Sequence, residues 1–374
     1  MNLYWRLKRR NTLKDERKKI IVLGDKDPAE GEARLVKGFI LRLIPPIDEF
    51  RWIRSWENFY PLFHDGFLNI MKSYNYSYSH GERKEFYATT NQELFKKLRE
   101  ADAPDLHDDL VLIPPPEFWT ILCYDLADVL FPEWSQKKLG EGVSVDYLRN
   151  YKLARKVITL SKSLKRELIR FGVDHKKITV LPFDFGEPVR KPLIPLPKNY
   201  LLVPVYAEER DNIQNIKAAL NAVKDSLRIK TVFLNLSMNK DAKLDLDGFR
   251  VVTPGSLSEV EGWFYRARAV LYIPSYDGWG WPAIAAIRYG KPLISAGNSA
   301  LLEVAPGYAE YVREDEVEHI VHVLRRVWNN EYKINNEVRD ELMRTYTSEF
   351  ARNTLKRVVE ETLRKSEDGQ KGTH

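Results

Sequence analysis

Short, continuous apolar runs alternate along the chain with longer segments in which apolar residues recur at helical spacing. The short runs are typical of buried parallel strands, and the longer segments are typical of helices that cover a sheet. In the first half the pattern predicts strands at 19–24, 109–113, 119–122, 156–161 and 177–181, and helices at 31–43 and 162–171. Ser161 and Gly172 stand where the second helix should begin and end, because serine side chains cap helix N-termini and glycine ends helices readily.

A proline-rich stretch interrupts this alternation. Residues 182–198 contain five prolines and show almost no periodicity, which is typical of a linker. Beyond it the pattern predicts strands at 200–205, 231–236, 250–252 and 270–273, helices at 213–223 and 257–267, and a long charged helix at 335–365. The sequence therefore predicts two α/β halves of similar size, with the ligand site between them.

Composition limits the class of protein. With 374 residues, 44% hydrophobic and 30% charged, the chain is expected to form a globular protein of more than one domain. It contains no apolar run of about eighteen residues that would predict a transmembrane helix, and its first residues lack the apolar core of a secretory signal. The single cysteine, Cys123, excludes a disulfide framework, and the seven histidines show no metal-ligand spacing. We expect a cytoplasmic protein with no metal and no cofactor.

Basic residues outnumber acidic residues by 59 to 53, and the excess is concentrated near the start of the chain. Residues 6–19 hold eight Lys or Arg against two acidic side chains, beside Tyr4 and Trp5. Two interpretations are open: a peripheral contact of residues 4–19 with the inner membrane surface, or a solvated tail. Nucleic-acid binding has little support, because no basic and aromatic motif accompanies the charge. The abundance of Lys, Arg and Glu also suits a thermophile.

The stretch 274–307 carries the most distinctive chemistry. Gly278 and Gly280 flank Trp279 just before a predicted helix. A glycine backbone can approach a ligand closely, and the first turn of a helix offers unpaired N–H groups to an anion. These features predict a phosphate or diphosphate site. The alternative is a strand–turn–helix corner that is packed by Trp279 and Trp281.

Six segments in order carry a family resemblance: 154–161, 255–258, 265–269, 274–282, 290–294 and 301–304. Together they resemble the retaining, nucleotide-sugar-dependent glycosyltransferases of the GT-B fold, in the large fourth family (glycosyl transferases group 1). The resemblance runs from about residue 105 to 350. It implies an α/β architecture of two Rossmann-like domains, whose parallel sheets face a central cleft, and a site that requires no divalent ion.

The resemblance also implies a division of the chain. An acceptor-side domain is expected at 1–185 and a proline-rich linker at 186–198. The nucleotide-sugar donor domain is expected at 199–340, and a C-terminal helix at 341–374 is expected to cross back to the first domain.

Site residues follow from matching positions. The resemblance implies that Arg210 binds the leaving diphosphate, that Asp277 orients the transferred sugar, and that Tyr124 and Asp125 contact the acceptor or that sugar. Glu303 is expected to brace a helix beside the donor site. The remaining donor-binding residues are expected to be Gly31, Asn212, Gly255, Ser275, Gly278, Trp279 and Gly280.

Simpler interpretations of the same residues stay open. Arg210 lies in a charged loop where a solvated side chain is common, Asp277 precedes a glycine and suits a turn or cap, and Tyr124 suits packing.

The chain departs from the family's pattern at the expected site. Asp277 replaces the family's first glutamate, and Ala285 replaces the second, which usually holds the ribose hydroxyls. Asp211 replaces a lysine, and Tyr124 replaces a histidine.

We expect a glycosyltransferase that moves a sugar from a nucleoside-diphosphate sugar to a glycan, lipid-linked or protein acceptor, with retention of configuration. The alternative is a catalytically silent GT-B scaffold or binding protein, because a fold does not guarantee an activity.

Overall fold

The computed structural model describes the chain in several stretches. They are 20–24, 50–54, 69–73, 84–89, 110–112, 119–123, 125–134, 147–181, 196–237, 244, 246–345, 350–351, 353–355, 357–358 and 361. Gly31, Tyr124 and the basic segment 4–19 lie outside the described residues, so the roles expected of them remain predictions. Among the described residues, no helix is both long enough and apolar enough to span a bilayer.

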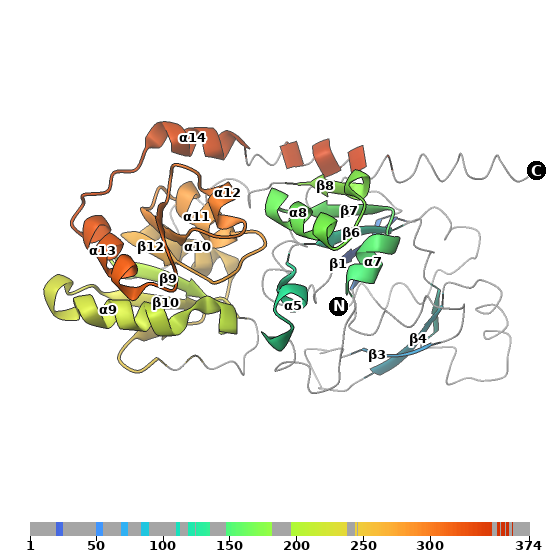
Figure 1. Cartoon of the computed structure of the whole chain (residues 1–374). Coiled ribbons are helices and arrows are strands. Elements are labelled where there is room, and N and C mark those ends of the chain that lie inside the picture. The colour runs from blue at the N-terminus through green and yellow to red at the C-terminus, as the bar shows by residue number, and fades with distance from the viewer. Residues whose placement is uncertain are drawn as a thin grey trace, which may run out of the picture.

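A parallel sheet with the strand order β2-β1-β6-β7-β8 forms the centre of the N-terminal half (Figure 1). Its strands are β1 (Ile20–Gly24), β2 (Phe50–Arg54), β6 (Trp119–Cys123), β7 (Lys156–Thr159) and β8 (Ile178–Val180). A smaller sheet contains β3 (Asn69–Ser73), β4 (Lys84–Thr89) and β5 (Leu110–Leu112). The short apolar runs of the sequence thus form strands as predicted.

The described helices of this half are α5 (Ala127–Leu130), α7 (Tyr147–Leu153), α8 (Lys162–Arg170) and the 3₁₀ turn η4 (His175–Lys177). Ser161 caps α8 as predicted, because its Oγ accepts a hydrogen bond from the Leu164 amide at 3.1 Å. Leu164 and Leu168, one turn apart, are buried in the same core cluster as Val157 of β7. Gly172 ends the helix with φ 85°, a conformation that glycine adopts readily.

The C-terminal half contains a second parallel sheet, with the order β11-β10-β9-β12-β13-β14. Its strands are β9 (Leu201–Val205), β10 (Thr231–Asn235), β11 (Arg250–Val252), β12 (Ala269–Tyr272), β13 (Leu293–Ala296) and β14 (Glu310–Val312). This is the doubly wound order of dinucleotide-binding folds, and it reverses between β9 and β12. In such sheets a ligand binds at the carboxyl ends of the strands, beside the point of reversal.

Helices cover this second sheet. They are α9 (Ile213–Leu227), α10 (Leu257–Arg266), α11 (Trp281–Arg288), α12 (Leu301–Val304), α13 (Val317–Trp328) and α14 (Asn336–Thr345), with a 3₁₀ turn η5 (Glu209–Asp211). Every residue of α11 is buried, because this apolar helix is packed between the sheet and its neighbouring helices.

The two halves share apolar packing. Leu122 and Ile158 of the N-terminal half belong to the same core cluster as β9 and β12. Leu355, beyond α14, is buried in this cluster, and Glu361 forms an ion pair with Lys156 of β7 at 2.7 Å. Figure 1 shows the red segments after α14 beside α8 and β8. These contacts are those expected of a returning C-terminal helix, although α14 runs across the predicted boundary at residue 340, and the exact division of the chain stays a prediction.

Candidate functional site

Two loops meet at the point where the order of the second sheet reverses. One follows β9 and contains η5, with Arg210, and the other follows β12 and contains Asp277. The Ser275 amide donates a hydrogen bond to the Arg210 carbonyl oxygen at 2.8 Å, so the loops are joined directly. The structure therefore brings together two of the residues that the sequence predicted for the site.

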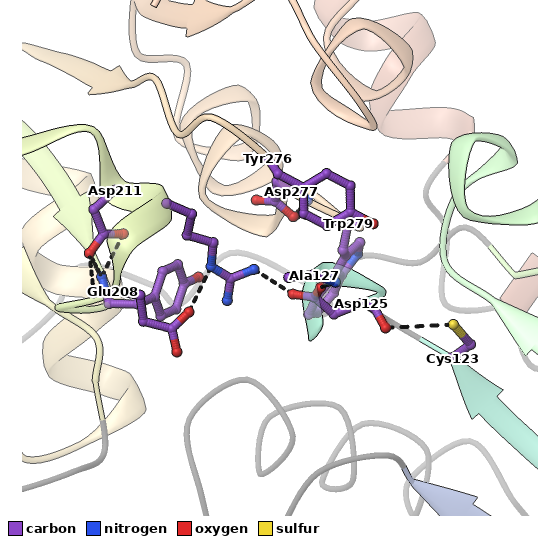
Figure 2. A network of polar contacts seen from close by, with 12 residues as sticks. Cys123, Asp125, Ala127, Glu208, Asp211, Tyr276, Asp277 and Trp279 are labelled. Atoms are coloured by element: carbon purple, nitrogen blue, oxygen red, sulfur yellow. Dashed lines mark hydrogen bonds and ion pairs between the residues drawn. The ribbon is translucent and has the colours of Figure 1, made fainter. Parts of the chain in front are cut away.

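Arg210 is buried, with 5% of its surface exposed, so the interpretation of a solvated arginine is wrong. Its guanidinium forms an ion pair with Asp125, which follows β6 in the other half, and a second with Glu208 at 2.8 Å. The guanidinium thus lies between the carboxylates of Asp125 and Glu208, which are labelled in Figure 2. Removing either charge would leave a buried group poorly compensated, which is costly.

Asp125 has a second role in its own half. Its other carboxylate oxygen accepts a hydrogen bond from the Ala127 amide at 2.6 Å, at the start of α5 (Figure 2). The side chain is thus held in place by a local turn and presents its remaining oxygen to Arg210. Of the predicted residue pair at this strand end, only Asp125 is described.

Asp211 closes its own loop. Its buried carboxylate accepts hydrogen bonds from the amides of Tyr206 at 2.9 Å and Glu208 at 2.8 Å. Burial raises the pKa of Asp211 to about 7, and these hydrogen bonds oppose the rise. Figure 2 shows the carboxylate turned toward the backbone of this loop. Asp211, the residue that the sequence resemblance aligns with a lysine, is therefore a brace inside its own loop.

Asp277 occupies the centre of the glycine-rich turn and has only 3% of its surface exposed. One carboxylate oxygen accepts hydrogen bonds from the amides of Trp279 and Gly280, both at 2.7 Å, and the other accepts one from the Tyr272 hydroxyl. Burial raises the pKa of Asp277, while the Arg210 charge lowers it. This is the turn or cap role that the sequence left open for Asp277. The amides of Trp279 and Gly280, which were expected to bind a phosphate, therefore already have an acceptor.

The tryptophans of this turn pack inside the molecule. Trp279 and Trp281 are buried, and Trp281 lies against Phe264 with ring centroids 5.8 Å apart. Gly280 adopts φ 77°, and a Cβ there would lie 3.0 Å from both Leu301 and Val304. The turn is therefore a tightly packed corner, and the loop that contains it is hydrogen-bonded to the Arg210 carbonyl through Ser275.

Side chains from the N-terminal half reach the same turn. The Ser161 hydroxyl donates to the Gly278 carbonyl oxygen at 2.8 Å, and the Tyr276 hydroxyl donates to Glu167 at 2.9 Å. Burial raises the pKa of Glu167. The turn thus contacts both Ser161, the N-cap of α8, and Glu167 within the helix.

Glu303 of α12 completes the N-terminus of α8. Its two carboxylate oxygens accept hydrogen bonds from the amides of Lys162 at 2.7 Å and Ser163 at 3.0 Å. With Ser161 capping the Leu164 amide, the first three N–H groups of α8 all have acceptors. Glu303 was expected to brace a helix beside the donor site; the helix it caps is α8 of the N-terminal half, and its donor-site role stays a prediction.

The other predicted residues lie around the same edge of the sheet. Asn212 adopts φ 55° and donates a side-chain hydrogen bond to the Glu314 carbonyl oxygen at 2.5 Å. Ser275 is exposed beside Arg210. Gly255 follows β11, two strands from β9, and its amide donates to Glu259 at 2.9 Å. Their expected contacts with a donor remain predictions.

Several partners in this site were not predicted as site residues, among them Glu208, Tyr272 and Glu167. The sequence offered a signal for Glu208 as a site residue, because it precedes Arg210 in a charged loop. The sequence offered no such signal for Tyr272 or Glu167, since a tyrosine in a strand and a glutamate in a helix are both common and do not indicate a site. Ala285, at the position of the family's second glutamate, is buried in α11 and offers no polar side chain. Within the described stretches, no group of three or more potential metal ligands occurs.

Comparison with known proteins gives a fold. No protein-family model matches the chain, and no curated protein matches it in sequence. Similar solved structures include a glycosyltransferase of Rickettsia africae, with 10% identity and a TM-score of 0.53 over 93% of this chain and 99% of that one. A sucrose-phosphate synthase of Thermosynechococcus elongatus has 13% identity and a TM-score of 0.55 over 92% and 99% of the two chains. An α,α-trehalose 6-phosphate synthase of Burkholderia multivorans has 10% identity and a TM-score of 0.56 over 96% and 99%.

These structures share the α/β architecture with parallel sheets, and the chain has the GT-B fold. At such low identity the likeness extends to the fold only.

Proposed function

We propose that this protein is a glycosyltransferase that moves a sugar from a nucleoside-diphosphate sugar to an acceptor, with retention of configuration. One observation carries the proposal: the loops bearing Arg210 and Asp277 meet at the carboxyl ends of β9 and β12, where a doubly wound sheet binds its ligand. The glycosyltransferase and the two sugar-phosphate synthases with the same fold support this assignment.

Arg210 is the residue that would stabilise the leaving group. As the bond between the anomeric carbon and the diphosphate oxygen breaks, the electron pair leaves with the diphosphate, and a nearby guanidinium stabilises the growing negative charge. The acceptor hydroxyl attacks from the same face and passes its proton to the departing phosphate oxygen. No separate protein base is needed for this step.

The Arg210–Asp125 ion pair suggests how the donor enters. Both partners are buried, and the pair joins the two halves. A diphosphate would take the place of the Asp125 carboxylate on the guanidinium. This exchange would leave Asp125 available to the sugar or acceptor hydroxyl, which is the role that the family resemblance implies for it.

Asp277 would act by holding the turn. Its bonds to the amides of Trp279 and Gly280 keep the turn in one shape beside Arg210. We propose a positioning role for Asp277, in addition to the contact with the transferred sugar that its place in the motif implies.

We also propose an acceptor class and a location for the protein. The acceptor is a glycan, a lipid-linked sugar or a protein, and the protein acts in the cytoplasm. Contact of residues 4–19 with the inner membrane surface would suit the lipid-linked case.

A second function, a silent GT-B scaffold, is favoured by one specific observation. The guanidinium of Arg210 and two amides of the turn already have partners within the chain, and Ala285 cannot hold a ribose. A protein that no longer binds a donor would keep such internal pairs as structural contacts.

Calorimetric titration with UDP, GDP and ADP separates these two functions. We expect one nucleotide to bind, Arg210→Ala to weaken it by about tenfold or more, and Asp125→Asn to strengthen it, because the competing carboxylate is gone. Arg170→Ala, at an exposed arginine of α8, is the matched control and should leave the affinity unchanged. Absence of binding by all three nucleotides, with a folded protein by circular dichroism, would favour the scaffold.

A further inference from the structure

The second sheet has a pocket at the edge opposite the candidate site. It lies at the amino ends of β9, β10 and β11 and against the last turns of α9, and its volume is about 470 Å³. Arg210 and Asp277 follow the carboxyl ends of β9 and β12. Because all strands of this sheet are parallel, the pocket and the candidate site lie at opposite ends of the same strands.

Four cations line the pocket. Lys198 precedes β9, Lys224 belongs to α9, Lys230 precedes β10, and Arg250 begins β11. The one acidic side chain in the lining is Asp247, so the formal charge of the lining is positive. Four segments of the chain thus each bring a positive side chain to one concave surface.

These cations are exposed and available to a ligand. Among the described residues, none of the three lysines forms an ion pair or donates a side-chain hydrogen bond. The guanidinium of Arg250 lies 5.4 Å from the centre of the Trp263 ring, a cation–π contact that supports the side chain without neutralising it. Uncompensated like charges repel one another, and a bound anion would relieve that repulsion.

The floor of the pocket is apolar and buried. Tyr200, Leu220 and Val232 line it and are buried in the core of the sheet. The Tyr200 hydroxyl donates to the Trp263 carbonyl oxygen at 2.5 Å, which fixes the ring. Sites of a few hundred Å³ with an apolar base and a few polar side chains are typical for small molecules and too small for a folded partner.

We infer that this pocket binds a small, multiply charged anion, such as an oligophosphate or a compact polycarboxylate, independently of the nucleotide-sugar site proposed above. The strand β9 joins Tyr200 in the pocket to the loop of Arg210, so an anion bound here would lie at the other end of the strand that positions that loop. The inference does not depend on glycosyl transfer.

Titration calorimetry of the full chain with inorganic tripolyphosphate, at low ionic strength, tests the inference. We expect saturable binding that Lys224→Glu with Lys230→Glu weakens by about tenfold or more, since two attractive charges become repulsive. Lys176→Glu with Lys333→Glu changes the net charge equally at exposed lysines outside the pocket, and should change the affinity by less than about twofold. A parallel titration with citrate distinguishes a phosphate ligand from a carboxylate ligand.

Three results would overturn the inference. The first is that neither anion binds. The second is that both double variants weaken binding equally, which would indicate unspecific attraction to net charge. The third is that UDP displaces tripolyphosphate and Arg210→Ala abolishes tripolyphosphate binding, which would place the anion in the nucleotide-sugar site. Saturable binding that survives Arg210→Ala but fails in the pocket variant supports the inference, even if no nucleotide binds.

Discussion

Both the backbone conformation of Gly280 and the close packing around it disfavour a side chain at this position. Its φ of 77° lies in the left-handed region, and a Cβ would meet Leu301 and Val304 at 3.0 Å. Gly248 has nearly the same conformation, with φ 81°, but a Cβ there would meet no atom within 4 Å. Comparing substitutions at the two glycines therefore distinguishes the free-energy cost of the left-handed conformation from the cost of steric crowding.

Gly280→Ala is expected to destabilise the fold more than Gly248→Ala. Both changes incur about 1–2 kcal/mol of left-handed strain, and only the first adds the cost of overpacking, about 1–3 kcal/mol. Urea unfolding of the two variants and the wild type measures the difference. Equal losses in the free energy of unfolding would show that α12 moves aside without cost.

A helix-capping serine joins secondary structure elements of the two halves. Ser161 caps the N-terminus of α8, and its hydroxyl also donates to the Gly278 carbonyl oxygen in the C-terminal half. Ser256 caps the N-terminus of α10 in the same manner, accepting from the Glu259 amide at 3.2 Å, and this cap involves only its own half. These two serines form a natural pair for comparing a local cap with one that joins the halves.

Ser161→Ala should cost about twice as much as Ser256→Ala. Each loses a helix cap, about 1 kcal/mol, and Ser161→Ala also leaves the Gly278 carbonyl without this donor, at about 1 kcal/mol more. Amide exchange in α8 should quicken only in the first variant. Chemical unfolding with hydrogen-exchange mass spectrometry checks both statements, and unchanged exchange in α8 after Ser161→Ala would contradict them.

Much of the element pattern was predictable, because buried strands need continuous apolar runs. The strand predicted at 200–205 is β9, and the one at 270–273 is β12, shifted by one residue. The helix predicted at 213–223 in fact continues to Leu227. The prediction ended too early because the last turn of the helix is mostly polar and shows no apolar periodicity. Arg210 and Asp277 were predicted for one site, and they meet because parallel strands end at the same edge.

The contacts between halves were not predictable from local pattern. Asp125 and Arg210 are 85 residues apart, and Lys162 and Glu303 are 141 apart. Such pairs depend on how two sheets dock, for which composition and periodicity carry no signal. The capping role of Asp277 was open in the sequence because an Asp-Gly pair suits both a turn and a ligand site.

For the whole molecule, burial of Glu167 between the halves makes docking sensitive to pH. Its pKa is raised by burial from the ordinary value of 4.5, although the Tyr276 hydroxyl donates to it. The docked protein therefore holds this proton more tightly than the unfolded chain does. Stability from this group is complete below pH 4.5 and is lost as the pH rises toward the raised pKa.

Glu167→Gln should remove this dependence, since an amide oxygen can still accept from Tyr276. Relative to the variant, the wild type is expected to lose free energy of unfolding as the pH rises above 4.5, by at most about 1.4 kcal/mol per pH unit. Above the raised pKa the difference should become constant. Unfolding curves at several pH values measure it, and a difference that stays constant throughout the range, or changes in the other direction, would contradict the assignment.

The cap that Glu303 provides to α8 has a consequence for the order of events during synthesis. A ribosome completes α8 long before it adds the residue that satisfies the Lys162 and Ser163 amides, 141 and 140 positions later. Glu361, the partner of Lys156, emerges later still. At the usual rates of translation the nascent N-terminal half waits many seconds with this helix end incomplete. The N-terminal half thus reaches its final stability only after Glu303 and Glu361 have been added and have closed over it.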